Sequence, residues 1–217
     1  MVGRNMMEAI STSETSELSH AIDRGAKFVY LDPRYTKTAS KASEWLPIRP
    51  GTDSAFLLAM INVIVSNELA DCDFVKQYVI GCDDIQEAMR RYTPQWAEQI
   101  TGVPASMIER IAREYAAAKH NALAHPGWRT SNFVNSFQTE RAIATLNALS
   151  GNVLTPGGCL SADVSAEGAG LGAPSGESGS CAPPRLCLHR AIRLSSAIGV
   201  QKRDFGLIQR ENVTPCE

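Results

Sequence analysis

The sequence lacks the short motifs that mark several common classes of protein. None of its six cysteines forms a C-x-x-C pair, and their spacing suits neither a zinc site nor a cubane iron–sulfur site. It has no G-x-G-x-x-G fingerprint and no G-x-x-x-x-G-K-[ST] loop, which argues against an NAD-binding Rossmann site and a P-loop. The formal net charge of -2 over 217 residues argues against a nucleic-acid-binding protein that relies on a broad basic surface.

Long hydrophobic runs are also missing. The longest apolar stretch, residues 55–65, is too short to span a bilayer and contains Asn62. The first residues, MVGRNMMEAISTSETSE, carry one arginine and no apolar segment of the kind found in a signal peptide. With 44% apolar and 20% charged residues, the composition is that of an ordinary globular protein. We expect a soluble chain, and the sequence does not define its compartment.

Strand-like and helix-like segments alternate along the chain up to about residue 150. A short, continuous apolar run at residues 27–31 predicts a buried strand, and residues 45–48 and 121–124 predict further strands. Helical spacing and capping residues predict helices at residues 15–24, 54–68, 74–79, 84–91, 94–100, 104–119 and 136–149. The alternation predicts an α/β fold: a three-layer Rossmann-like domain with a mainly parallel sheet and helices on both faces.

The composition of the chain changes near residue 160. Residues 161–184 are rich in alanine, glycine, serine and proline without periodicity, and residues 186–217 show only a weak helical pattern. Such segments bury too little apolar surface to offset the entropy of ordering them. We therefore predict an α/β region at residues 1–160 and an irregular or disordered tail at residues 161–217.

Two acidic turns stand where an α/β fold binds ligands. Asp32-Pro33-Arg34 follows the first predicted strand, and Gly51-Thr52-Asp53 opens a predicted helix. Each has an ordinary structural explanation, because Asp-Pro is a common turn and Thr-Asp a common helix cap. Together they also suit a nucleoside site at the carboxyl edge of the sheet. One carboxylate would accept hydrogen bonds from ribose hydroxyls, and the other would accept the two parallel N–H donors that guanine, unlike adenine, presents.

Several motifs in a fixed order resemble those of one enzyme family. They are DRGAKFVYLDPRYTKTASKASEWLPIRPGTDSAFLLAM, LADCDFVKQYVIGCDDI, YTPQWAEQITGVPASMIERIAREYAAAK and HPGWRTSNFVNSFQTERAIATLNALSGNVLTPGG. In this region the chain resembles the bis-molybdopterin guanine dinucleotide oxidoreductases of the dimethyl-sulfoxide-reductase family. The HPGWR segment is most similar to the thiosulfate, polysulfide and tetrathionate reductases, and arsenate-reductase-like members and formate dehydrogenases remain alternatives.

The resemblance implies which residues contact the cofactor, molybdenum bis-molybdopterin guanine dinucleotide. Contacts to the guanosine part of one pterin dinucleotide would come from Asp32, Pro33, Arg34, Tyr35 and Thr36. A second contact would come from Gly51, Thr52 and Asp53, with Asp53 reading guanine. Trp128 and Asn132 would line the pterin and pyrophosphate channel. Arg129 would face cofactor phosphate, reach the substrate pocket or have a structural role.

The resemblance also implies parts that this region does not supply. In the family, the molybdenum ligand and the cysteine cluster for a 4Fe-4S centre lie before the matching segment, so we expect no catalytic residue and no metal ligand here. The family also implies an iron–sulfur electron-transfer subunit and a membrane anchor as partners, and members of this branch are often periplasmic. We therefore expect an internal fragment of a catalytic subunit, which needs the missing remainder of that subunit.

Three functions remain open from the sequence. The chain is the cofactor-binding part of a molybdopterin oxidoreductase, a stand-alone guanine-nucleotide or pterin-binding module without catalysis, or the inert product of a broken gene. The substrate is not predicted, because its pocket would be built largely by residues outside this chain.

Overall fold

The computed structural model describes residues 1–9, 12–80, 82, 84–127, 130, 132–153, 155 and 158. Within them the strands are β1 (Val29–Leu31) and β2 (Glu44–Leu46). The helices are α1 (Met6–Ala9), α2 (Thr12–Asp23), α3 (Lys37–Lys41), α4 (Asp53–Ser66), α5 (Cys72–Tyr78), α6 (Ile85–Met89), α7 (Pro94–Thr101), α8 (Ala105–Ala117) and α9 (Ser136–Leu149). The predicted helices are confirmed with shifted ends, whereas α1 and α3 are too short to show a periodic pattern. The predicted tail lies outside the described residues.

A small parallel sheet carries the N-terminal part of the chain. β1 pairs with β2 in parallel, with Val29 opposite Glu44 and Leu31 opposite Leu46. On the other side of β1, Val2 forms a parallel bridge with Leu31. The amide of Val2 then donates to the carbonyl oxygen of His125 at 3.0 Å. The buried strand predicted at residues 27–31 is therefore confirmed as β1, with neighbours on both sides.

The strand predicted at residues 121–124 is wrong, because the described chain has no strand there. A side chain takes the place of a neighbouring strand. Asn147 Nδ2 donates to the carbonyl oxygen of Ala124 at 2.9 Å, and the amide of Ala124 donates to Asn147 Oδ1 at 3.0 Å. Since both backbone groups of Ala124 are already bonded, no ladder forms at this position. The sheet in the described residues therefore has two strands, fewer than the predicted three-layer fold requires.

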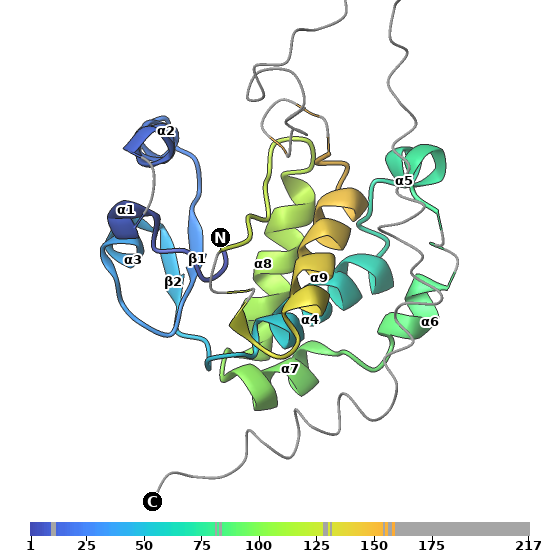
Figure 1. Ribbon diagram of the computed structural model, residues 1–217. Helices are drawn as coiled ribbons and strands as arrows, with labels where there is room; N and C mark the ends of the chain where they lie inside the picture. The colour runs from blue at the N-terminus through green and yellow to red at the C-terminus, as the bar shows by residue number, and fades with distance from the viewer. Residues whose placement is uncertain are drawn as a thin grey trace, which may run out of the picture.

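Side chains of β1 alternate between two apolar clusters, as the period of a strand dictates. Leu31 packs into the main core, whereas Phe28 and Tyr30 pack with Ala39 into a smaller cluster that Leu18 also contacts. In Figure 1, α1, α2 and α3 lie on one side of the strands, and α4, α8 and α9 lie on the other. The described chain is thus a mixed fold of helices and short parallel strands.

Helix α4 is the centre of the main core. Its sequence, DSAFLLAMINVIVS, is apolar on nearly all sides, and most of its residues are buried, as expected for a helix surrounded by others. It packs against α6, α7, α8 and α9. The one amide inside this helix, Asn62, is satisfied because its Nδ2 donates to the carbonyl oxygen of Met89 at 2.8 Å.

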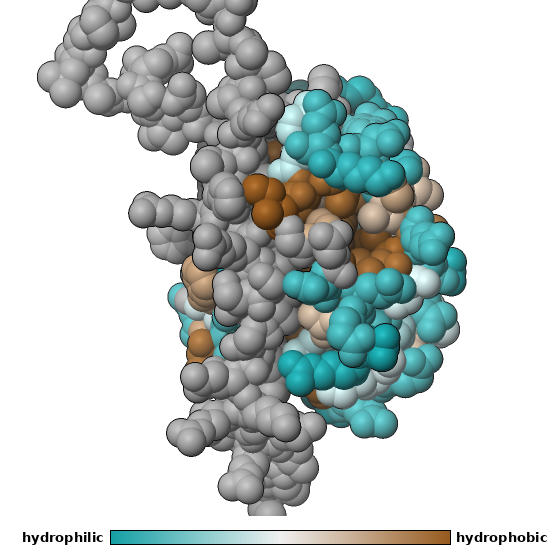
Figure 2. Space-filling model, turned by 90° about the vertical axis from the view of Figure 1, so that its right-hand side faces the viewer, coloured by the Kyte–Doolittle hydropathy of each residue, from teal (hydrophilic) through white to brown (hydrophobic). Residues whose placement is uncertain are grey.

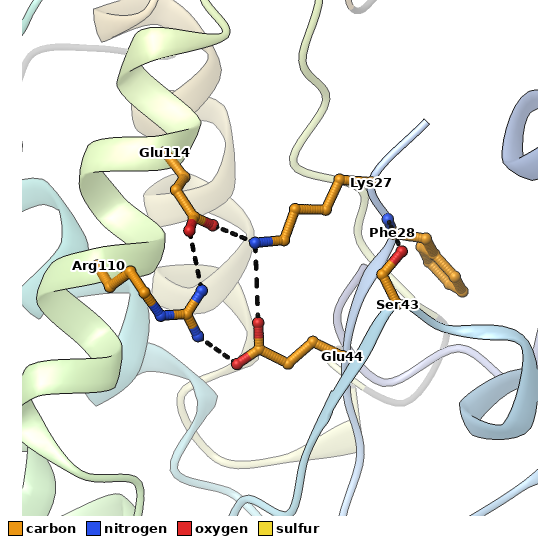
Figure 3. A network of polar contacts seen from close by, with 6 residues as sticks. All are labelled: Lys27, Phe28, Ser43, Glu44, Arg110 and Glu114. Atoms are coloured by element: carbon orange, nitrogen blue, oxygen red, sulfur yellow. Dashed lines mark hydrogen bonds and ion pairs between the residues drawn. The ribbon is translucent and has the colours of Figure 1, made fainter. Parts of the chain in front are cut away.

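Four charged side chains join the strand layer to α8 (Figure 3). Lys27 Nζ lies 2.5 Å from Glu114 Oε2 and 3.9 Å from Glu44 Oε2. Arg110 pairs with Glu114 at 3.0 Å and also with Glu44. Each of the four side chains therefore forms two ion pairs. We name these residues, Lys27, Glu44, Arg110 and Glu114, the α8 ion network.

The face that carries α5 and α6 shows a band of hydrophobic residues between hydrophilic ones (Figure 2). Partly buried side chains from this part of the chain, such as Val75 and Val79, pack against the main core. No helix among the described residues is long and apolar enough to cross a membrane.

Candidate functional site

The first acidic turn is fixed by two hydrogen bonds to a buried carboxylate. Asp32 follows β1 directly and is 7% exposed. The hydroxyl of Tyr30 donates to Asp32 Oδ2 at 2.8 Å, and the amide of Arg34 donates to Asp32 Oδ1 at 2.8 Å. Burial raises the pKa of Tyr30, so this hydroxyl stays protonated and remains a donor. Each oxygen of Asp32 therefore has a protein donor and still keeps a lone pair for a ligand.

Aromatic and hydroxyl side chains hold the rest of this turn. Trp45 Nε1 donates to the carbonyl oxygen of Asp32 at 2.9 Å. The ring of Tyr35 meets that of Trp45 edge to face, with centroids 5.1 Å apart, and Tyr35 is 65% exposed. Thr36 caps α3, because its Oγ1 accepts from the amide of Ala39 at 3.3 Å. Trp45 and Thr36 thus hold the turn in place, while Tyr35 remains exposed on its surface.

The second turn has the features of a type II β-turn. The amide of Thr52 donates to the carbonyl oxygen of Arg49 at 3.3 Å, Pro50 occupies the second position, and Gly51 has a φ of 77°. Glycine suits that third position because it adopts a positive φ without a steric penalty. Thr52 occupies the N-cap position of α4. However, its Oγ1 donates to the carbonyl oxygen of Arg49 at 2.7 Å instead of capping the helix.

Asp53, the first residue of α4, presents a buried carboxylate that lacks a donor from elsewhere. It is 9% exposed. Burial raises the pKa of Asp53 to about 6, a hydrogen bond from its own backbone opposes that rise, and the charge of Asp32 adds to it. Among the described residues, no other residue donates a hydrogen bond to this carboxylate. Such a group favours a ligand that brings N–H donors.

A loop that is distant in the sequence lies against the second turn. A Cβ atom placed on Gly51 would lie 3.3 Å from Cδ1 and 3.6 Å from Cε1 of Phe133. Phe133 is 42% exposed, and Asn132 beside it is exposed. Phe133 is not among the residues predicted from the sequence, because no motif links it to Gly51. Likewise, Tyr30 belongs to the apolar run that predicts the strand, so the sequence does not indicate that its hydroxyl donates to Asp32.

The sequence-predicted site residues therefore divide into four groups. Asp32, Thr52 and Asp53 are buried, and the charge of Asp32 raises the pKa of Asp53. Thr36 and Gly51 are partly buried. Exposed members of the two turns and of the loop around Asn132 are Pro33, Arg34, Tyr35 and Asn132. Trp128 and Arg129 lie outside the described residues. No group of three or more histidine, cysteine, aspartate or glutamate side chains in the described residues could hold a metal ion.

The sequence matches the family model of the molybdopterin oxidoreductases over residues 1–208. The chain belongs to this family. It is 42% identical to the thiosulfate reductase molybdopterin-containing subunit PhsA of Salmonella typhimurium, in an alignment that covers 72% of this chain and 21% of that protein. It is 37% identical to the dimethyl sulfoxide reductase DmsA of Escherichia coli, covering 61% of this chain and 19% of that protein.

Among solved structures, the chain is similar to acetylene hydratase from Pelobacter acetylenicus. The TM-score is 0.66 at 34% sequence identity, and the match covers 72% of this chain and 21% of the other. The chain therefore spans about a fifth of the length of the relatives it matches. Family membership implies a molybdenum–molybdopterin cofactor. The donor-poor carboxylate of Asp53 fits a group that brings N–H donors of its own.

Proposed function

We propose that this chain binds the guanosine end of a molybdenum bis-molybdopterin guanine dinucleotide, as the cofactor-binding part of a larger oxidoreductase subunit. The observation that carries the proposal is the buried carboxylate of Asp53, to which no other described residue donates a hydrogen bond. The N1–H and N2–H groups of guanine are two parallel donors that suit the two oxygens of one carboxylate. Adenine offers no such pair, so Asp53 would select guanine.

Burial makes the interaction of Asp53 with guanine strong. Hydrogen bonds to a charged group stabilise a complex by about 1.5–3 kcal/mol each, and a buried site is screened less by solvent than an exposed one. With a pKa of about 6, Asp53 is mostly ionised at neutral pH and can accept both donors. Donors on the ligand favour the ionised carboxylate, so binding lowers the pKa of Asp53.

The first turn supplies the contacts for the rest of the nucleoside. Asp32 keeps free lone pairs at the carboxyl end of β1, where α/β folds bind ribose hydroxyls. Arg34 offers a planar cation for phosphate or for a flat base. We assign supporting contacts in the same site to Pro33, Tyr35, Thr36, Gly51 and Thr52. We assign Trp128, Arg129 and Asn132 to the pterin and pyrophosphate part of the cofactor.

The chemistry of the intact subunit comes from the bound cofactor, which supplies the redox centre. This chain contributes placement, because its two buried carboxylates fix the nucleotide end of the cofactor. Reduction of a sulfur compound or another oxyanion is the reaction we propose, since one relative is a thiosulfate reductase subunit and another a dimethyl sulfoxide reductase. Because one similar protein is an acetylene hydratase, similarity alone does not define the substrate.

The proposal extends to the parts that surround this chain. A 4Fe-4S centre, an iron–sulfur subunit and a membrane anchor would complete the electron path, and the remainder of the catalytic subunit would cover the cofactor. Within the chain, we propose residues 1–160 as the cofactor-binding unit, with residues 161–217 outside it. Together with the rest of the catalytic subunit, the short parallel strands would become part of a larger parallel sheet in a three-layer Rossmann-like domain.

The test compares the binding of GMP and AMP to the full chain by titration calorimetry at neutral pH. Asp53→Asn replaces one carboxylate oxygen by an NH₂ group that repels the guanine donors. We expect this change to reduce GMP affinity about 10- to 150-fold and to leave AMP affinity unchanged. The matched control is Asp73→Asn, in the first turn of α5, where the side chain is exposed. Equal affinities for GMP and AMP in the unmodified chain would refute the proposal.

Turnover is the second test, because the proposal gives this chain no redox ligand. The isolated chain should not reduce tetrathionate, thiosulfate, polysulfide or arsenate with reduced viologen as the electron donor. Placement of a nucleotide tail alone does not supply the redox chemistry. Stoichiometric molybdenum together with steady turnover on any of these substrates would contradict a purely cofactor-binding role.

A further inference from the structure

Phe133 is one of the large apolar side chains exposed in the described residues, and its ring lies against the second turn. Val134, just before α9, is 91% exposed, and Phe137, in the first turn of α9, is 71% exposed with the guanidinium of Arg141 over its ring. Phe133 is 42% exposed because part of its ring lies against Gly51. It therefore presents an aromatic surface beside the turn that carries Asp53, and no motif in the sequence indicates this contact.

The contact depends on the absence of a side chain at Gly51. Three ring atoms of Phe133, namely Cδ1, Cε1 and Cγ, would lie 3.3–3.7 Å from a Cβ atom at that position. Glycine at a φ of 77° therefore serves two purposes, since it forms the turn and leaves space for the ring. The ring is in turn held next to the turn that precedes α4.

The loop that carries Phe133 is anchored at both ends. Before it, Thr130 is 2% exposed, and its Oγ1 donates to Glu140 Oε1 at 2.5 Å. After it, the amide of Ser136 donates to the carbonyl oxygen of Phe133 at 3.0 Å, at the start of α9. An exposed aromatic ring with both flanks fixed loses little entropy when a flat ligand packs on it.

We propose that Phe133 is the stacking wall of the nucleoside site, with its exposed ring surface packed on the flat face of the base whose edge Asp53 binds. This inference rests on the proposed guanosine binding and adds a residue to it. The two groups recognise different features of one base. A carboxylate reads the pattern of donors on its edge, whereas an aromatic ring packs on any base because every base has a π-face. Asp53 would give selectivity for guanine, and Phe133 would give affinity that is similar for every base.

This division of roles gives a test with two nucleotides. GMP and AMP are titrated into the full chain and its Phe133→Leu, Phe133→Tyr and Phe137→Leu variants. Loss of one base–aromatic stack corresponds to a loss of affinity of about 5- to 150-fold. We expect Phe133→Leu to weaken GMP and AMP by the same factor, so that their ratio stays constant. Phe133→Tyr should restore the affinity of the unmodified chain, and Phe137→Leu should change neither nucleotide.

A spectroscopic readout tests the contact in the unmodified chain as well. We expect the H8 proton of bound GMP to shift upfield and to show a nuclear Overhauser effect to the ring protons of Phe133. Both signals should persist in Phe133→Tyr and disappear in Phe133→Leu. Thermal unfolding of each variant establishes that it is folded, and the nuclear Overhauser effect stays decisive if Phe133→Leu does not fold.

The outcomes separate this inference from the proposed function. Affinity of Phe133→Leu within about twofold of the unmodified chain, below the range for a lost stack, would overturn the stacking role. If Asp53→Asn still abolished the preference for GMP, guanosine binding would stand without it. An equal loss in Phe137→Leu would assign the effect to the apolar loop as a whole and would also overturn the role of Phe133. No preference for GMP in the unmodified chain would overturn both proposals.

Discussion

The charge of Asp32 raises the pKa of Asp53, so the two acidic turns share one electrostatic environment. One turn ends β1 and the other opens α4, with α3 and β2 between them in the chain. Both carboxylates are buried. Two nearby buried charges of the same sign destabilise an unliganded protein.

Asp53 makes the stability of the unliganded chain depend on pH. Its pKa is about 6 in the folded state and ordinarily 3.8, so the folded state binds this proton more tightly than the unfolded state. The free energy of unfolding therefore falls as the pH rises from about 4 to about 6, and it stays reduced above that range. Asp53→Asn removes the titration and should raise the free energy of unfolding by about 1–3 kcal/mol at neutral pH.

Urea unfolding at several pH values measures this effect. The control is Asp73→Asn, whose exposed side chain should leave the pH profile unchanged. Parallel profiles for Asp53→Asn and the unmodified chain would show that Asp53 titrates in the folded state as it does in an unfolded chain.

Gly51→Ala should destabilise the chain more than the same change at Gly25. Both glycines have a positive φ, 77° and 91°, so each substitution carries a similar backbone cost of about 1–3 kcal/mol. A Cβ at Gly25 meets nothing within 4 Å, whereas one at Gly51 meets the ring of Phe133 at 3.3 Å. The difference between the two variants in urea unfolding isolates the contact with Phe133. Equal losses would mean that the ring moves aside without cost.

Asn147→Ala should cost about 2–4 kcal/mol in the free energy of unfolding. Asn147 is 5% exposed, and its side chain bonds both backbone groups of Ala124 and the hydroxyl of Tyr115. Removing it leaves the partly buried backbone groups of Ala124 without these partners, at about 1–3 kcal/mol for each. Hydrogen exchange at the amide of Ala124 should accelerate in this variant. The exposed Asn121 gives the control, since Asn121→Ala should leave that amide protected.

Arg110→Ala should destabilise the chain by about 0.5–1.5 kcal/mol at low salt, because Arg110 pairs with two carboxylates of the α8 ion network. The network is partly exposed, so high salt should reduce the loss. Arg90→Ala breaks one exposed pair with Glu87 on α6 and should cost less than Arg110→Ala at every salt concentration. A loss for Arg110→Ala that does not change with salt would assign its effect to packing of the alkyl chain.

Local patterns in the sequence determined most of the helices and the position of the two turns. Residues 54–66 are apolar on nearly all sides, and a helix with that composition has to be surrounded by others, as α4 is. Asp32-Pro33 and Pro50-Gly51 fix their turns through constraints within a few residues, so they are visible without knowledge of the fold. The ordered motifs from residue 23 onward also indicated the family to which the chain belongs.

Contacts between distant residues depended on tertiary structure. Residues 121–124 have strand-like composition, but the side chain of Asn147 occupies the hydrogen-bonding groups that a ladder would need. Phe133 meets Gly51 only because α9 packs on α4 and brings its preceding loop to that turn. The pKa of Asp53 likewise depends on burial and on a charge from another turn. Local sequence encodes backbone preference, whereas burial and side-chain pairing arise only when separate segments fold together.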